Sequence, residues 1–199
     1  MAQTSTTHAS EMRARILDAA QRVMHNDGYR ATTMPAIATE ADVSVGLLYR
    51  YFESKEELHL AMCEAITQAQ LDELSVQLAG IQDTTERLAM GVRLFIEGLE
   101  AKDWGGIVVA GWAEAETNPR MRDLLQRRCD QLRSFAAMFI RDSIARGEVD
   151  PTLDVEQVSL GVAMLFDGAL AHHTEVGRRF DPGMAERAIT GLLAGVLRS

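Results

Sequence analysis

The four prolines of this 199-residue chain all stand where a helix can begin. Asn118-Pro119, Asp150-Pro151 and Asp181-Pro182 each place a capping side chain before a residue whose φ angle already suits a first helical turn. Pro35 follows two threonines, which can cap a helix in the same way. Because none of these prolines interrupts a helical pattern, the segments between them are free to form long helices.

Apolar residues repeat at helical spacing along most of the chain, for example at Ile16, Ala20 and Val23. The β-branched run at 107–109 resembles a strand, but no second strand-like run could pair with it, so we interpret it as part of a buried helix. We therefore predict an all-α fold of about nine helices. The expected helices cover residues 10–27, 34–40, 44–51, 54–79, 84–101, 105–116, 119–146, 154–176 and 182–197.

Composition excludes several other classes of protein. With 47% hydrophobic and 25% charged residues, the chain is typical of globular proteins. Two cysteines, Cys63 and Cys129, and no CxxC pair exclude a disulfide scaffold and a cysteine-rich zinc module. No apolar run approaches the ~20 residues that span a bilayer. We expect a cytoplasmic protein without a membrane partner, preceded by a flexible tail at residues 1–9.

Charge is unevenly distributed over a chain whose net charge is −9. Residues 1–60 hold six Lys or Arg against eight Asp or Glu, a net of −2, and the remainder holds 14 against 21, a net of −7. Binding to DNA phosphates requires cations, so bulk charge does not favour a non-specific DNA-binding protein. The nearly neutral front segment can bind DNA only if geometry places the right groups.

Residues 28–55 predict two short helices joined by a tight turn. Gly28 ends the first long helix, Thr33 can cap the second, and Ser44 can cap a third that runs to about Phe52. Helices this short are stable only when packed on a neighbour. Three such helices are what a helix-turn-helix requires, with the third presented to the major groove of DNA.

The segment at about 13–62 resembles the N-terminal domain of the tetracycline-repressor (TetR) family of bacterial transcriptional regulators. The motifs that carry the resemblance are Ile16-Leu17-Asp18-Ala19-Ala20, Gly28-Tyr29, Thr32-Thr33, Ile37-Ala38, Val43-Ser44, Gly46, Leu48-Tyr49, Tyr51-Phe52 and Ser54-Lys55-Glu56. The resemblance implies a helix-turn-helix DNA-binding domain at residues 10–54. It also implies a helical domain at 55–199 that binds a ligand and forms a dimer.

The resemblance also suggests roles for individual residues on the DNA-binding side. Thr33, Tyr49, Tyr51 and Lys55 match positions that usually bind phosphates in the family, while Ser44, Val45, Gly46, Leu47 and Arg50 lie on the outward face of the third helix. Arg50 is the candidate for direct base recognition, because a guanidinium matches guanine O6 and N7. Packing remains the alternative for the two tyrosines, and a solvated side chain for Arg50. Leu48 and Phe52 are expected in the core.

Two further sets of residues follow from the expected second domain. The dimer interface is expected on the last two helices, at Val158, Gly161, Val162, Leu165, Ala169, Ile189, Leu192, Leu193 and Val196. A ligand pocket is expected at Phe95, Trp104, Trp112, Phe135, Met138, Phe139, Phe166 and His173, although each of these could simply be core. Carboxylates at Glu114 and Glu116 beside Trp112 would suit a cation.

No catalytic triad, phosphate loop or metal-binding spacing appears, so we expect neither an enzyme nor a cofactor or metal. The leading hypothesis is a ligand-responsive repressor that binds a palindromic double-stranded operator as a homodimer and is released by a small, largely apolar effector. The alternative is a helical small-molecule-binding or protein-interaction module whose helix-turn-helix does not recognise DNA. The arginines and aspartates at 120–142 are expected to form a solvated helix face.

Overall fold

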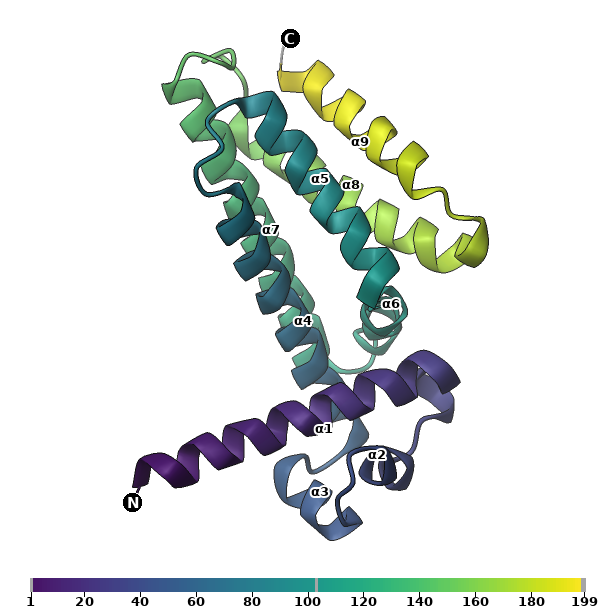
Figure 1. The fold of residues 1–199 in the computed structure, drawn as a ribbon. Helices are drawn as coiled ribbons and strands as arrows, with labels where there is room; N and C mark the ends of the chain where they lie inside the picture. The colour runs from purple at the N-terminus through teal and green to yellow at the C-terminus, as the bar shows by residue number, and fades with distance from the viewer. Residues whose placement is uncertain (1, 103, 198–199) are drawn as a thin grey trace. The chain divides into compact units, whose positions relative to one another are not determined.

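The computed structural model describes residues 2–102 and 104–197, and every regular element within them is helical (Figure 1). The predicted all-α fold is confirmed. The helices are α1 (Ala2–Ala31), α2 (Met34–Glu40), α3 (Val45–Tyr51), α4 (Lys55–Leu78), α5 (Thr84–Lys102), α6 (Gly105–Glu114), α7 (Pro119–Ala145), α8 (Val155–Val176), the short 3₁₀ helix η1 (Gly177–Arg179) and α9 (Pro182–Leu197). No helix in the described part is both long and apolar enough to cross a membrane.

The chain forms two compact units. The first unit contains the residues up to Ile66 together with Gly106–Arg122, and the second contains Thr67–Gly105 and the residues from Asp123 onward. The first unit therefore extends past the domain boundary expected after residue 54. Leu58 and Met62, at the start of α4, are buried and belong to this unit.

Helix α1 is longer than the sequence predicted. Residues 2–9, expected as a flexible tail, belong to α1, and residue 1 lies outside the described residues. This segment contains neither glycine nor proline, so no residue in it interrupts the helix. Gly28 breaks the helical geometry as predicted, with a φ of 77°, and a last helical stretch follows to Ala31.

The turn between α2 and α3 is tight because Asp42 takes a left-handed conformation, with a φ of 52°. Asp42 N–H donates to the Thr39 carbonyl, and Val43 N–H donates to the Ala38 carbonyl, which ends α2. Aspartate tolerates this backbone conformation better than most non-glycine residues. The turn predicted at residues 41–43 therefore brings α3 across α2, and both helices belong to the first unit.

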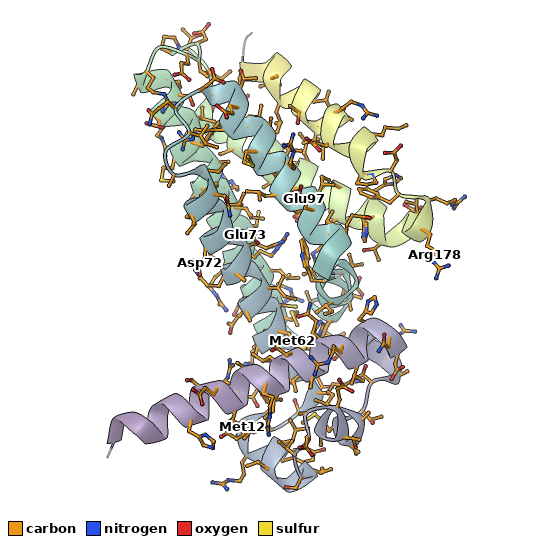
Figure 2. The ribbon with its side chains drawn as sticks, in the orientation of Figure 1. Met12, Met62, Asp72, Glu73, Glu97 and Arg178 are labelled. Atoms are coloured by element: carbon orange, nitrogen blue, oxygen red, sulfur yellow. The ribbon has the colours of Figure 1, made fainter. Side chains whose placement is uncertain are left out.

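The second unit is a helical bundle in which α5 and α9 lie side by side and α8 contacts both (Figure 1). Ile140, Val149 and Leu197 form one buried cluster, with Leu88 and Val158 packed against it. Helix α7 buries the face that carries Ala136 and Ile140. Figure 2 shows the side chains that fill the space among these helices.

Candidate functional site

Helix α3 has one face in the core and one face outward. Leu48 is fully buried and Phe52, its C-terminal cap, is 1% exposed, so both are core residues as expected. On the outward face Val45 is 38% exposed and Tyr49 is 48% exposed. Arg50 is exposed as well. This seven-residue helix therefore exposes the guanidinium of Arg50, the phenol of Tyr49 and the small apolar side chain of Val45.

The hydroxyls at the starts of α2 and α3 serve as helix caps. Thr33 Oγ1 accepts from Ala36 N–H at 3.3 Å, and Ser44 Oγ accepts from Leu47 N–H at 3.1 Å. Each hydroxyl keeps its own proton for a further acceptor, such as a phosphate oxygen. Gly46 is exposed, and a Cβ built there would meet no atom within 4 Å, so another molecule can approach the backbone closely.

Lys55 binds backbone carbonyls at the C-terminal end of α1. Its Nζ donates to the carbonyls of Tyr29 and Thr32 at 3.0 and 3.1 Å, and it lies 4.6 Å from the centre of the Tyr29 ring. A cation is favourable at a helix C-terminus. An ammonium has three N–H donors, so one remains for the expected phosphate contact, which stays a prediction. Tyr51, expected to contact a phosphate, and Leu47, expected on the outward face of the third helix, are half-buried, and their roles stay predictions as well.

A buried polar cluster in the first unit was missed by the sequence analysis. His59 is fully buried, with Nδ1 2.8 Å from Glu114 Oε2 and Nε2 2.8 Å from the Ile107 carbonyl. Asn118 Nδ2 donates to Glu114 Oε1 at 2.7 Å. A carbonyl only accepts, so the Nε2–H of His59 donates to Ile107, and Nδ1 pairs with the Glu114 carboxyl group.

The same cluster corrects the expectation of a cation site beside Trp112. Glu114 is already paired with His59 and Asn118, so its carboxylate is not free for a ligand. Tyr29 packs on the His59 ring at 4.4 Å between centroids, and burial, together with Glu114, raises the pKa of the Tyr29 phenol. No local sequence signal could reveal this cluster, since His59 and Glu114 lie 55 positions apart.

The second unit contains a cavity of about 80 Å³ among α4, α5, α7, α8 and α9. Its walls are apolar except for one arginine. The lining residues are Leu74, Leu78, Arg87, Leu88, Gly91, Val92, Leu132, Phe135, Ala136, Phe139, Ile140, Val158, Val162, Phe166, Leu193 and Leu197. Three expected pocket residues, Phe135, Phe139 and Phe166, lie here.

A second cavity, of about 50 Å³, shares Leu74, Leu132 and Phe166 with the first. Two expected pocket residues, Phe95 and Trp104, line it, and Phe95 stacks edge-on against Trp104 and Phe166. Arg128 also lines this cavity. Arg128 is only 4% exposed and its Nη1 donates to Asp167 Oδ1 at 2.7 Å, so it departs from the solvated face expected for α7.

The other three expected pocket residues lie elsewhere. Met138 is 57% exposed, because successive residues of a helix are rotated by about 100° and this turns it away from the buried face at Ala136 and Ile140. Trp112 belongs to the first unit. His173 lines neither cavity; its Nε2 lies 3.3 Å from Glu100 Oε1 and its ring packs edge-on against Phe180.

The expected dimer-interface residues divide between the core and the surface. Ile189 and Leu193 are 6% and 4% exposed, because their face of α9 packs inside the unit, and Val158 and Val162 line the first cavity. These contacts lie within one chain, and the interface role expected for the four residues stays a prediction. Gly161, Leu165 and Ala169 are half-buried, while Leu192 and Val196 are 60% and 41% exposed. Leu160, Met164 and Met184 are also exposed large apolar residues of these two helices.

Two family models match the chain and together cover most of it. Residues 16–62 match the model of bacterial regulatory proteins of the tetR family, and residues 84–198 match the C-terminal model of BetI-type transcriptional repressors. The chain belongs to the TetR family. The predicted function, a ligand-responsive DNA-binding transcriptional regulator, is thereby confirmed for this TetR-family member.

Individual relatives agree with this membership. The transcriptional regulator UidR of Escherichia coli (strain K12) is 28% identical over 165 residues, which is 83% of each chain. BetI of Rhizobium meliloti (strain 1021) is 29% identical over 160 residues, or 78% of this chain and 74% of BetI. A transcriptional regulator from Saccharomonospora viridis, solved in complex with choline, superposes with a TM-score of 0.81 at 26% identity, over 93% of this chain and 96% of that one.

Proposed function

We propose that this TetR-family member represses transcription as a homodimer on a palindromic operator, and that a small, largely apolar molecule in the second unit releases it. The observation that carries the proposal is the outward face of α3, which exposes Ser44, Val45, Gly46, Tyr49 and Arg50 from a helix whose opposite face is buried. A helix of this kind fits the major groove. The protein acts by binding rather than by catalysis, and its place of action is the cytoplasm.

Each part of the outward face has a proposed role. Arg50 recognises a guanine, Val45 contacts a thymine methyl group or the groove wall, and Gly46 lets the backbone approach the DNA. Thr33, Ser44, Tyr49 and Tyr51 donate to phosphates and set the position of α3. Lys55 contributes its remaining N–H donor to the same backbone.

The dimer is proposed on the exposed apolar faces of α8 and α9. Leu160 and Met164 on α8 are 41% and 66% exposed, and Leu192 on α9 is 60% exposed. Large apolar side chains grouped in this way mark protein interfaces. Exposed glycines at 168, 191 and 195 allow helices of two protomers to approach closely. A two-fold dimer would match the symmetry of a palindromic operator.

Selection of random duplex DNA by the purified protein, at one fixed physiological salt concentration, tests this function. We expect recovery of a palindrome whose half-sites lie about one helical turn or more apart. Failure to enrich any sequence, repeated after denaturation and refolding to remove bound ligand, would contradict the proposal and favour a helix-turn-helix that does not recognise DNA.

Arg50→Ala then tests the assigned residue on the selected palindrome. Loss of a bidentate contact should cost roughly 1–3 kcal/mol of discrimination at one base position, measured by fluorescence anisotropy on single-base variants. Arg178→Ala provides the matched control, because Arg178 is an exposed arginine of η1 in the second unit (Figure 2). Equal weakening on all sequences would make Arg50 a phosphate contact instead.

A further inference from the structure

We propose that the first cavity of the second unit binds an acyl compound, that is, an apolar chain with one carbonyl or carboxylate oxygen, and that this oxygen accepts from Arg87. The inference rests on the proposed function, because it takes this cavity as the effector site. It names the chemical class of the effector, which none of the similarities above assigns to this chain.

The shape and lining of the cavity favour a chain-like apolar body. Every lining residue except Arg87 is apolar or a glycine, so polar atoms elsewhere on a ligand would be buried without partners. A water-sized group needs about 10–15 Å³ of such space, so about 80 Å³ accommodates roughly five to eight methylene-sized groups. The second cavity, beyond Phe166, offers about 50 Å³ more.

Arg87 supplies one hydrogen-bond donor that no group of the protein uses. Its Nη1 donates to Asp142 Oδ2 at 2.5 Å and its guanidinium lies 4.9 Å from the centre of the Phe139 ring. Its Nε is buried and has no hydrogen-bond partner. A buried donor without an acceptor is costly, so a small shift of the Arg87 side chain that brings this N–H to a ligand oxygen in the cavity would gain affinity from the contact.

A cationic ligand fits this cavity poorly. Of the described residues that line it, none is a carboxylate, and the guanidinium of Arg87 repels a second cation at short range in an apolar interior. Asp142, the carboxylate paired with Arg87, is shared with Arg146. The lining of the second cavity includes the exposed carboxylate of Glu73 (Figure 2). It also includes the cation Arg128.

The second cavity carries another donor of the same kind. Trp104 is 2% exposed and lines this cavity, and its Nε1–H has no hydrogen-bond partner. Each cavity is therefore lined by a residue with a buried N–H that has no hydrogen-bond partner, although Gln70, Glu73 and Arg128 make the second cavity more polar than the first. Such donors favour oxygen acceptors on a ligand over an ammonium group.

The test is direct binding of four probes to the purified full-length protein by calorimetry and thermal denaturation. The probes are octanoate, methyl octanoate, octyltrimethylammonium and choline, each below its micelle concentration. We expect octanoate and methyl octanoate to bind and raise Tm, and the two cations to bind at least tenfold more weakly than octanoate. Comparison of octanoate with its ester shows whether the acceptor is a carboxylate or a carbonyl. Cation binding equal to that of octanoate, or no binding of either acyl probe, would overturn the inference.

Two variants locate the binding site. Arg87→Met keeps the side-chain length and removes the donor, and should weaken octanoate binding at least tenfold, while Arg93→Met on the same helix, whose partner Glu186 is at the surface, should not. Gly91→Leu fills the cavity and should abolish binding of both acyl probes. A Cβ at Gly91 meets Leu78 and Leu74 at ordinary contact distances, 3.8 and 4.0 Å, and thermal denaturation without ligand checks that the leucine variant folds. Unchanged binding in either Arg87→Met or Gly91→Leu would contradict the inference.

Binding to the protein alone separates this inference from the proposed function. If octanoate binds and depends on Arg87 and Gly91, but does not release the selected DNA, the ligand class is supported and the proposed regulation fails. If the protein selects a palindrome but binds neither acyl probe, the ligand class fails and the proposed DNA binding stands.

Discussion

The two compact units differ in how completely their buried polar groups are paired. Among the described residues, all buried side-chain nitrogen and oxygen atoms without a hydrogen-bond partner belong to the second unit, at Arg87, Trp104, Arg133, His173 and Thr190. In the first unit the fully buried His59 has acceptors at both ring nitrogens. Native proteins pair most buried polar groups, so unpaired ones call for a functional explanation.

We infer from this difference that the proposed site of the first unit lies on its surface, whereas that of the second unit lies in its interior. Among the described residues, the first unit has no unpaired buried side-chain nitrogen or oxygen atom, and its proposed DNA-binding face lies outward on α3. The second unit keeps apolar space and unused donors inside, where a ligand can complete the packing. Substitutions in the two interiors should therefore have opposite consequences.

The largest expected effect is in the core of the first unit. Leu48→Ala removes a fully buried side chain beneath the recognition face and should destabilise the protein by roughly 2–5 kcal/mol in urea denaturation followed by circular dichroism. Val76→Ala, at a residue that is 71% exposed, is the control and should stay within about 0.5 kcal/mol of wild type. A loss below 1 kcal/mol for Leu48→Ala would show that this interior can relax as readily as the second.

A smaller loss is expected from the buried polar cluster. Glu114→Gln removes the carboxyl group that pairs with His59 and should cost roughly 1–3 kcal/mol, because it replaces a hydrogen-bond partner of a fully buried polar side chain. The same urea titration measures it, with the exposed Glu116→Gln as control. If both variants unfold at the same urea concentration as the wild type, the hydrogen bonds of His59 do not stabilise the first unit, and the proposed difference between the two interiors is contradicted.

Glycine-to-alanine substitutions should differ in their effect on stability between the two units. Gly91→Ala in α5 should stabilise by about 0.5–1 kcal/mol, because alanine favours a helix interior and its Cβ has room. Gly111→Ala in α6 should give no such gain, because its Cβ would lie 3.3 Å from the sulfur of the buried Met121. Thermal denaturation checks both, and an equal gain in the two variants would remove this difference between the interiors.

The smallest effect concerns a surface cluster of the second unit. Hydrogen bonds from Arg146 and Thr84 lower the pKa of Glu148 from 4.5 to about 2. Ionised Glu148 therefore contributes stability above about pH 4.5 that is lost as the pH falls toward 2. Glu148→Gln should flatten the decrease in Tm over this range, and the exposed Glu97→Gln on α5 is the control (Figure 2). An unchanged pH profile would contradict the assigned contacts.

The sequence predicted the helices well because their signals are local. Caps at Thr33, Ser44 and Asp154 and the proline at 182 set helix ends that the structure places within a residue or two of the expected ones. The start of α1 was wrong, since the segment at 2–9 contains no helix breaker and polar composition alone does not end a helix. The outward position of Arg50 followed from the same local pattern.

The interior sites were harder to predict because they depend on contacts distant in sequence. Helical periodicity placed Phe135 and Phe139 inward, but it did not separate them from the exposed Met138. The sequence did not indicate Arg87 as a pocket residue, because the cavity that it lines forms only when five helices distant in sequence pack together. Ile189 and Leu193 were assigned to a dimer because an apolar helix face looks the same whether its own chain or a partner covers it.

The most direct measurement is the affinity for the selected palindrome, at fixed salt, with and without saturating octanoate, for wild type and Gly91→Leu. The account predicts that octanoate weakens wild-type binding roughly 5–150-fold, the usual range of coupling between two sites, and leaves Gly91→Leu unchanged. Unaltered wild-type affinity with octanoate bound, or equal weakening in both proteins, would contradict release of the operator through this cavity.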